Sequence, residues 1–299
     1  MIPVVIGVTI IIFTIMYFSP GDPAQIICGP NATYDEVEAK RIEMGLYDPY
    51  IVRLGNYLGA VFLRFDFGRS YINNRPVSTD ILSRYPYTAT IASLSILLSL
   101  LIGVPLGVAA ATHQNKFGDY IAMLVSFIGV SMPNFWVGLL LVIWLSLSLG
   151  LLPALGVGGI QYYIIPCFAC SLQGIASLAR QTRSSMLEVI RSDYIVTARS
   201  KGQTENKVIY RHALSNALIP VVTSAGGSFG AMLGGTLVIE TVFAIPGLGT
   251  FMVTAINNRD YPAIQGAVIC VAITFSLVML IVDLIYAFID PRIWAQYRG

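Results

Sequence analysis

The side chains that most often carry catalysis are few in this chain and lie far apart in its sequence. His113 and His212 are the two histidines. Cys167 and Cys170 have the CxxC spacing of metal and redox sites, but they lie in an apolar run with no second pair and no nearby histidine, which favours core thiols. No Walker A pattern of glycines and lysine occurs, so we expect no ATP site here. The sequence therefore predicts no catalytic residue and no bound metal or cofactor.

Two carboxylates lie within or beside apolar runs, where ionisable groups are candidates for function. Asp283 lies well inside an apolar helix, about two turns before Asp290, so a capped or ion-paired structural acid and a gate both stay open. Glu240 follows an apolar run and could either anchor a neighbouring helix or meet a transported solute. Both are possible pore or gate residues.

Polar and helix-bending residues also occur within the apolar runs. Pro133 with Asn134 predicts a kink whose freed backbone groups are satisfied inside a helix bundle. Gln173 gives another run the character of a bundle interior rather than of a lipid-facing helix. Such a kink can be a hinge in a pore, although plain packing is the more common explanation. We keep Pro133, Asn134 and Gln173 as possible pore residues.

The densest charge lies between residues 180 and 211. Seven Lys/Arg and three Asp/Glu give this stretch a balance of +4, whereas the whole chain carries +2. A helix that ends near Lys201 would have cations in its last turn and Gly202 at its C′ position, and Thr204 could cap a second helix. A polar helix–glycine–helix element has a shape that could bind a partner. The positive charge by itself is also consistent with a solvated loop that only sets the membrane topology.

The residues around Gly202 resemble the cytoplasmic EAA loop of ABC-importer permeases, in which E-A-A is followed by three residues, Gly, nine residues and I-x-L-P. The two alanines fall on Thr197 and Ala198, and the leucine falls on Leu214. The positions that depart from the pattern are Val196, His212 and Ser215.

These departures resemble the dipeptide, oligopeptide and nickel branch of that family, which reads D-Y-x-x-T-A-R-x-K-G and then H-A-L-x-N-A-L-x-P. The resemblance implies that the loop is the coupling helix, which docks into a cleft of an ATPase subunit. For His212, a structural role in this helix is favoured over a proton relay. The ATPase-coupling residues that the resemblance implies are Asp193, Tyr194, Thr197, Ala198, Arg199, Lys201, Gly202, His212, Leu214 and Asn216.

The resemblance extends over almost the full length of the chain. The long hydrophilic stretch after the first helix is similar to the first of the two permeases that such systems encode. The fold implied is the type I, MetI-like permease fold, with six transmembrane helices and cytoplasmic coupling helices. Further segments that resemble this branch are 20–24, 45–50, 67–70, 75–77, 131–136, 239–249, 258–262 and 283–292.

The resemblance also implies the partners and the solute. The partners are a second homologous permease, two ATP-binding subunits that hold the ATP and Mg, and an extracytoplasmic solute-binding protein. Di- and oligopeptides are the first expectation for the solute, with nickel, a nickel chelate or glutathione as alternatives. An ion-coupled secondary transporter is less favoured, because only Asp283 lies well inside a span and no internal repeat is clear. An intramembrane enzyme would need paired reactive groups at membrane depth, and none are found.

The composition agrees with a membrane protein. Hydrophobic residues make up 56% of the chain and charged residues 11%, against about a quarter charged in ordinary globular proteins. Apolar runs recur at the length of roughly 20 residues that a bilayer needs, whereas a β-barrel would alternate over ~10-residue segments. We expect an all-α protein surrounded by lipid, with no nucleic-acid partner.

Six spans are expected. The first lacks the basic residues of a signal peptide and no small-residue cleavage site follows it, so we expect a retained helix. The third is expected to be one span, kinked at Pro133. Residues 241–261 are too polar for a span and are expected to form a turn helix at the outer mouth. The predicted spans are 2–18, 88–112, 120–149, 161–178, 221–243 and 264–287.

The distribution of charge sets the expected orientation. The turns 113–119 and 180–211 and the tail hold ten Lys/Arg, against one in the two short alternate loops, so both termini are expected in the cytoplasm. The resemblance implies that the membrane is the cytoplasmic membrane of a bacterium or archaeon. The hydrophilic stretch is expected outside, with helices at 35–44 and 50–63, the second along the membrane interface. The expected domains are the first helix 1–18, an extracytoplasmic segment 19–86, a five-helix core 87–288 that includes the coupling loop 180–215, and a cytoplasmic tail 289–299.

Overall fold

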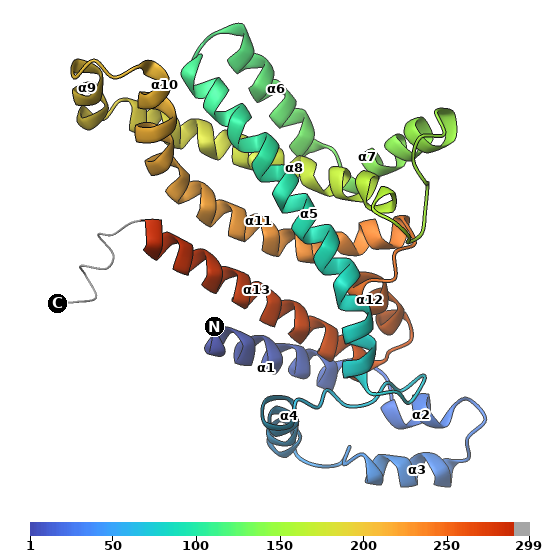
Figure 1. Ribbon diagram of the computed structural model, residues 1–299. Helices are drawn as coiled ribbons and strands as arrows, with labels where there is room; N and C mark the ends of the chain where they lie inside the picture. The colour runs from blue at the N-terminus through green and yellow to red at the C-terminus, as the bar shows by residue number, and fades with distance from the viewer. Residues whose placement is uncertain (290–299) are drawn as a thin grey trace, which may run out of the picture. The chain divides into compact units, whose positions relative to one another are not determined.

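The computed structural model describes residues 1–289, and helices make up the regular structure of this part of the chain (Figure 1). Within it, Arg69 and Pro76 form an isolated antiparallel bridge. Four helices are long and apolar enough to cross a membrane, and one bent pair adds a fifth if it is counted as a single span. The predicted all-α membrane protein is confirmed. The predicted tail, 289–299, lies almost wholly outside the described residues.

The chain forms two compact units, residues 1–88 with 246–276 and residues 89–245 with the chain from 277. In the first unit, the helices predicted at 2–18, 35–44 and 50–63 are confirmed to within one residue. Its helices are α1 (Ile2–Phe18), α2 (Pro23–Cys28), α3 (Tyr34–Glu43), α4 (Tyr50–Arg64), the start of α5 (Val77–Thr112), α12 (Leu248–Asn257) and the first part of α13 (Tyr261–Ile289).

Local chemistry sets both ends of α3. The Thr33 hydroxyl accepts the N–H of Glu36, and the Glu36 carboxylate accepts the N–H of Thr33 at 2.8 Å, which completes a capping box. Just past the other end, Gly45 lies at φ +62°, in the left-handed region that glycine adopts without strain. The sequence therefore fixes this short helix with its own capping residues.

Small and polar residues join the elements of the first unit. A Cβ on Gly266 of α13 would lie 2.7 Å from the side chain of Val77, so the start of α13 packs against the start of α5 with no intervening side chain. Asp260 precedes α13 and accepts hydrogen bonds from the Ser70 hydroxyl and the Tyr71 N–H. The core residues of this unit include Val77, Ile81, Leu248, Phe251, Ala255, Tyr261, Ala263, Ile264 and Ala267.

In the second unit, hydrogen bonds join α5 to α8. The Ser95 hydroxyl donates to the carbonyl of Cys167 at 3.1 Å, and the Ser99 hydroxyl donates to that of Ser171 at 3.0 Å. Such bonds satisfy polar groups where no water reaches them. The further helices of this unit are α6 (Phe117–Ser131), α7 (Asn134–Leu141), the π-helix η1 (Val142–Ser148), α8 (Gln161–Ile190), α9 (Asp193–Ser200), α10 (Glu205–Lys207), the π-helix η2 (Val208–Ala213) and α11 (Leu214–Val242).

The predicted third span, 120–149, is wrong as a single kinked helix. The chain bends by 100° between α6 and α7. Met132 is extended, with ψ 132°, because the residue before a proline avoids the helical region, and Pro133 then precedes the new helix. At 1.5 Å per residue, α6 alone is about 22 Å long, short of the roughly 30 Å of a bilayer core. Length and composition therefore support four or five spans, with the shorter apolar α1 as a further candidate.

Four other predicted spans are shorter than their helices. The span predicted at 88–112 lies in α5, which begins at Val77, and the span predicted at 264–287 lies in α13, which begins at Tyr261. The span predicted to end at residue 178 continues in α8 to Ile190, because Thr182, Ser185 and Met186 are buried and give the added turns a packed face. The span predicted to begin at 221 starts at Leu214 and keeps Pro220 inside α11. Polar residues in these turns made the sequence look like a loop, but packing holds them helical.

Candidate functional site

The helix–glycine–helix element of the sequence is present in the structure. α9 ends at Ser200, and Gly202 follows at φ +72°, as a C′ glycine does. Thr204 lies at the N-cap of α10, although its side chain makes no capping hydrogen bond, so that part of the expectation is wrong. α10 lasts three residues and continues as η2 into α11. Figure 1 places α9 and α10 together at one end of the second unit.

An apolar anchor attaches α9 to the long helices. Ile195 is fully buried, with Val108 of α5, Met186 of α8 and Ala213 of η2 in the same core cluster. The amide of Asn216 donates to the Tyr194 hydroxyl at 2.9 Å, which ties α9 to α11. α9 therefore packs directly against residues of α5, α8 and α11.

An ion pair closes the loop across Gly202. Arg199 Nη2 lies 2.6 Å from Glu205 Oε1, and Arg199 Nε donates to Glu205 Oε2 at 3.1 Å. This bidentate arrangement matches the planar fork of the guanidinium. The pair bridges the end of α9 and the start of α10, and both side chains remain open to solvent.

The predicted coupling residues divide into an outward and an inward set. The Ala198, His212 and Leu214 side chains are half-buried, and the backbone carbonyl of His212 accepts a hydrogen bond from Asn216. The outward set combines charged residues with the exposed ring of Tyr194. Val196, which is not among the predicted coupling residues, is also exposed. The exposed coupling residues are Asp193, Tyr194, Thr197, Arg199, Lys201, Gly202 and Asn216.

Sequence reasoning missed a second ion pair near this element. Arg183 of α8 donates to Asp119 of α6 through Nε at 2.6 Å and through Nη2 at 2.7 Å. Asp119 is only 2% exposed and also accepts the N–H of Asn115 at 3.0 Å. Asp119 and Arg183 belong to the stretches 113–119 and 180–211, which were both expected on the same side of the membrane. That shared location is the sequence signal that could have suggested the pair.

Two of the predicted pore residues meet in a cavity of the second unit. Asn134 and Gln173 line a space of about 340 Å³ together with Arg180. The Asn134 Oδ1 atom is buried and has no hydrogen-bond partner in the described part of the chain. Arg180 contacts the ring of Phe127, with 5.9 Å to its centroid, and donates to the Ser126 carbonyl at 3.5 Å.

The other predicted pore residues lie elsewhere. Pro133 marks the break between α6 and α7. Glu240 is fully buried on α11, whereas Asp283 lies on α13 with an exposed side chain. None of these three lines the 340 Å³ cavity. Asp290, named as a neighbour of Asp283, lies outside the described residues.

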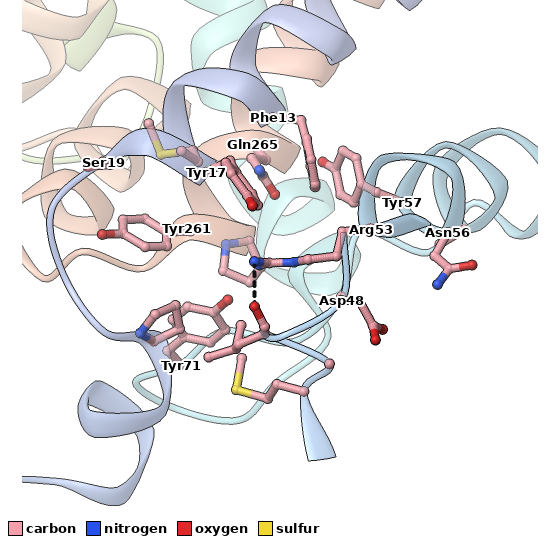
Figure 2. Close-up of a pocket in the computed structure, with 18 of the residues that line it drawn as sticks. Phe13, Tyr17, Ser19, Asp48, Arg53, Asn56, Tyr57, Tyr71, Tyr261 and Gln265 are labelled. Atoms are coloured by element: carbon pink, nitrogen blue, oxygen red, sulfur yellow. Dashed lines mark hydrogen bonds between the residues drawn. The ribbon is translucent and has the colours of Figure 1, made fainter. Parts of the chain in front are cut away.

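A larger cavity, of about 680 Å³, lies in the first unit (Figure 2). It collects residues from the end of α1, from the loop before α4, from α4 itself and from the start of α13. Seven aromatic side chains give it apolar walls, and burial raises the pKa of both Tyr57 and Tyr71, so these phenols keep their protons. The aromatic residues are Phe13, Tyr17, Tyr47, Tyr57, Phe67, Tyr71 and Tyr261.

Polar groups with few partners lie among these walls. Arg53 lies over the ring of Tyr17, with 5.0 Å to its centroid, and donates to the Leu46 carbonyl at 3.4 Å (Figure 2). Gln265 is 8% exposed, and its amide forms no hydrogen bond with any of residues 1–289. The buried hydroxyl of Tyr57 likewise has no partner in that range. Sequence reasoning did not identify this cavity, since its residues come from distant segments.

Known proteins match this chain over nearly its whole length. Residues 103–295 match the family described as binding-protein-dependent transport system inner membrane component, and residues 1–92 match the N-terminal family of the same membrane components. A putative peptide transport system permease protein of Brucella suis is 41% identical over 300 residues, which cover 98% of this chain and 95% of the relative. The glutathione transport system permease protein GsiC of Salmonella choleraesuis is 40% identical over 293 residues, with the same coverage.

A solved structure supports the fold. The MetNI methionine ABC transporter, in an inward-facing conformation, matches with a TM-score of 0.59 at 17% identity, over 70% of this chain and 96% of that one. The fold is therefore that of a MetI-like ABC permease. The chain belongs to the family of binding-protein-dependent transport system inner membrane components. It is a membrane permease of an ABC importer, as the resemblance around Gly202 implied.

Proposed function

We propose that this permease forms, with a second homologous permease, the pathway for di- and oligopeptides that a solute-binding protein delivers. The relatives support this solute class, because one is named a peptide permease and another a permease for glutathione, itself a small peptide. Glutathione is the first alternative solute, and nickel or a nickel chelate is the second. The energy comes from two partner ATPases that hold the ATP and Mg.

The observation that carries this proposal is the arrangement of α9, Gly202 and α10. A short helix with an exposed polar and aromatic face is attached through Ile195 to the long helices. Such an element can pass the motion of an ATPase cleft to the pathway without an energy-converting site of its own. In this proposal both termini and α9 lie in the cytoplasm, and the hydrophilic stretch 19–86 lies outside.

The 340 Å³ cavity is proposed as part of the pathway. Asn134 and Gln173 offer amide groups that can exchange hydrogen bonds with a peptide backbone, and Arg180 offers a positive charge. The break at Pro133 lets α7 move separately from α6. The buried Glu240 and the exposed Asp283 are proposed as structural or gating acids at the borders of this pathway.

Transport by the assembled importer tests the coupling element. The chain is produced with its partner subunits in vesicles, and uptake of a labelled dipeptide is measured with ATP inside. Gly202→Asp or Ala198→Arg should abolish uptake while the protein remains in the membrane. Gly202→Asn and Ala198→Ser are the matched controls, because the first tolerates a left-handed backbone without added charge and the second keeps a small side chain. Normal uptake by Ala198→Arg would contradict the coupling role.

The same vesicles separate the candidate solutes. Uptake of a dipeptide but not of glutathione or Ni²⁺ supports the peptide proposal, and uptake of glutathione alone replaces it with the first alternative. A chain that purifies without a second permease or an ATPase, and that transports without ATP, would overturn the proposed assembly.

A further inference from the structure

The 680 Å³ cavity of the first unit has the size and lining of a small-molecule site. Such sites usually measure about 300–1,000 Å³, with apolar and aromatic walls and a few convergent polar groups. Here the polar groups include Arg53, Gln265 and Tyr57, and Tyr17 and Tyr71 contribute to the aromatic walls (Figure 2). These residues come from four separate segments, so the fold assembles the cavity.

The polar groups of this cavity have unused hydrogen-bonding capacity. A guanidinium has five N–H donors, yet Arg53 makes one long hydrogen bond, at 3.4 Å, and no ion pair with the rest of residues 1–289. The Tyr57 hydroxyl is buried without a partner in the same range, and Gln265, a residue that is 8% exposed, lines the same cavity. Buried polar groups are normally paired, so the unpartnered Tyr57 hydroxyl, in the same cavity as a half-buried guanidinium with spare donors, indicates a ligand that supplies their partners.

The acids of the cavity are mostly occupied. Asp22 accepts two hydrogen bonds from Arg41, the shorter at 2.7 Å, and Asp66 accepts the N–H of Gly68 at 2.8 Å. Asp48 remains at the exposed edge. An anionic group therefore fits beside Arg53, and an ammonium group fits beside Asp48.

The position of α4 favours a dissolved ligand over a lipid. Ile51 and Leu63 are exposed, and Gly55 and Gly59 lie between them at helical spacing, so these residues form one open apolar face. α4 crosses α1 rather than running along it (Figure 1), so this face is suited to lie against the membrane surface. By helical spacing, Arg53 and Tyr57, which line the cavity, are on the opposite face of α4.

We propose that this cavity binds a short zwitterionic peptide, with the peptide carboxylate on Arg53, its amide on Gln265 and Tyr57, and its side chains against the aromatic walls. This rests on the proposed transport of peptides and adds a binding site outside the membrane pathway. The ammonium group lies toward Asp48.

Binding to the purified full-length chain in nanodiscs tests this site. The probes are alanyl-phenylalanine and its C-terminal amide, and calorimetry gives each Kd. A charge-assisted hydrogen bond contributes about 1.5–3 kcal/mol, so the free acid should bind about 10- to 100-fold more tightly than the amide. Arg53→Gln should remove that preference. Arg64→Gln is the matched control, since it removes the same charge from the same helix outside the cavity; it should bind like the wild type.

A second variant tests the site without the loss of a charge. Tyr57→Phe removes a hydroxyl that has no partner within residues 1–289 and keeps the ring against Phe13, 5.2 Å between centroids, so folding should be unaffected. The affinity for the dipeptide should still fall severalfold. Unchanged affinity in both Tyr57→Phe and Arg53→Gln would overturn the proposal.

Two further results distinguish a peptide site from a lipid site and from the transport pathway. The cavity is a lipid site if about one phospholipid per protein co-purifies with the wild type, is lost in Arg53→Gln and is not displaced by the dipeptide. Dipeptide uptake by the assembled importer, with no Arg53-dependent binding, would overturn the site and leave the proposed function standing. Arg53-dependent binding without dipeptide uptake would support the site and contradict the proposed function.

Discussion

The hydroxyl of Ser70 donates a hydrogen bond to the carboxylate of Asp260, a residue 190 positions away in the sequence. The other Asp260 oxygen accepts the N–H of Tyr71 at 3.1 Å, and Asp260 itself is buried. One carboxylate thus holds the loop before α5 against the start of α13, where Tyr71 and Tyr261 form one wall of the large cavity.

We expect Asp260→Ala to destabilise the first unit by about 1–3 kcal/mol, because it leaves the buried Ser70 hydroxyl and the part-buried Tyr71 N–H without an acceptor. The free energy of unfolding in detergent is the measurement, with proteolysis near Tyr71 as a local readout. Asp35→Ala is the control, since it removes an exposed carboxylate that makes no hydrogen bond within the described part of the chain. Equal stability of Asp260→Ala and the control would show that the bonds are not needed.

The pair of Arg183 and Asp119 should have a larger effect on stability. The Arg183 side chain is 25% exposed, but its removal leaves the buried Asp119 carboxylate without its charged partner, which costs about 1–3 kcal/mol or more. Arg183→Gln is therefore expected to lower the unfolding temperature more than Arg191→Gln, which removes an exposed guanidinium that donates to Gln114 at 3.3 Å. The double variant Asp119→Asn with Arg183→Gln should regain part of the loss. If the double variant is no more stable than Arg183→Gln, the unpaired charge of Asp119 is not the cause of the lost stability.

The features that the sequence predicted well depend on nearby residues. The bounds of α1 and of α3 and the C′ position of Gly202 all follow from side chains within a few positions of the feature they control. Apolar length likewise indicated membrane spans. Local rules were sufficient for these elements, because the backbone and the neighbouring side chains supply the interactions.

The features that the sequence did not predict depend on tertiary contacts. No local pattern indicates that Asp119 meets Arg183 at a separation of 64 residues, or that Arg53 and Gln265 share a cavity. The 100° bend at Pro133 is also larger than the expected kink. Two separate helices leave backbone groups without partners at the break, and only the packing of neighbouring helices decides whether those groups can be satisfied. These features need the packed structure.

Stability of the segment that holds α3 should depend on pH through Glu38. The Tyr47 hydroxyl, which donates at 2.7 Å, and the Arg41 guanidinium hold the pKa of Glu38 below its usual range. A carboxyl whose pKa is lower in the folded state contributes stability above its unfolded pKa, about 4.3, and that contribution is lost as the pH falls through the folded pKa. Glu38→Gln should therefore lower the unfolding temperature at pH 7 and have little effect at pH values well below about 4.

A pH series of thermal unfolding for the wild type and Glu38→Gln checks this expectation. Asp35→Asn is the control on the same helix, and its profile should follow that of the wild type. A constant difference between wild type and Glu38→Gln from about pH 7 down to about pH 3 would contradict the role of the carboxylate, because a neutral Glu38 differs little from glutamine.

The ion pair of Arg199 and Glu205 should matter for transport more than for stability. The two side chains are 39% and 55% exposed, and exposed pairs contribute at most about 1 kcal/mol, so Arg199→Glu should unfold within a few degrees of the wild type. It should still reduce ATP-driven dipeptide uptake severalfold, because repulsion from Glu205 opens the loop across Gly202. The swap of Arg199→Glu with Glu205→Arg restores attraction across the loop and should restore uptake. If the swapped protein remains as inactive as the single variant, Arg199 acts through its own charge on the partner and not through the shape of the loop.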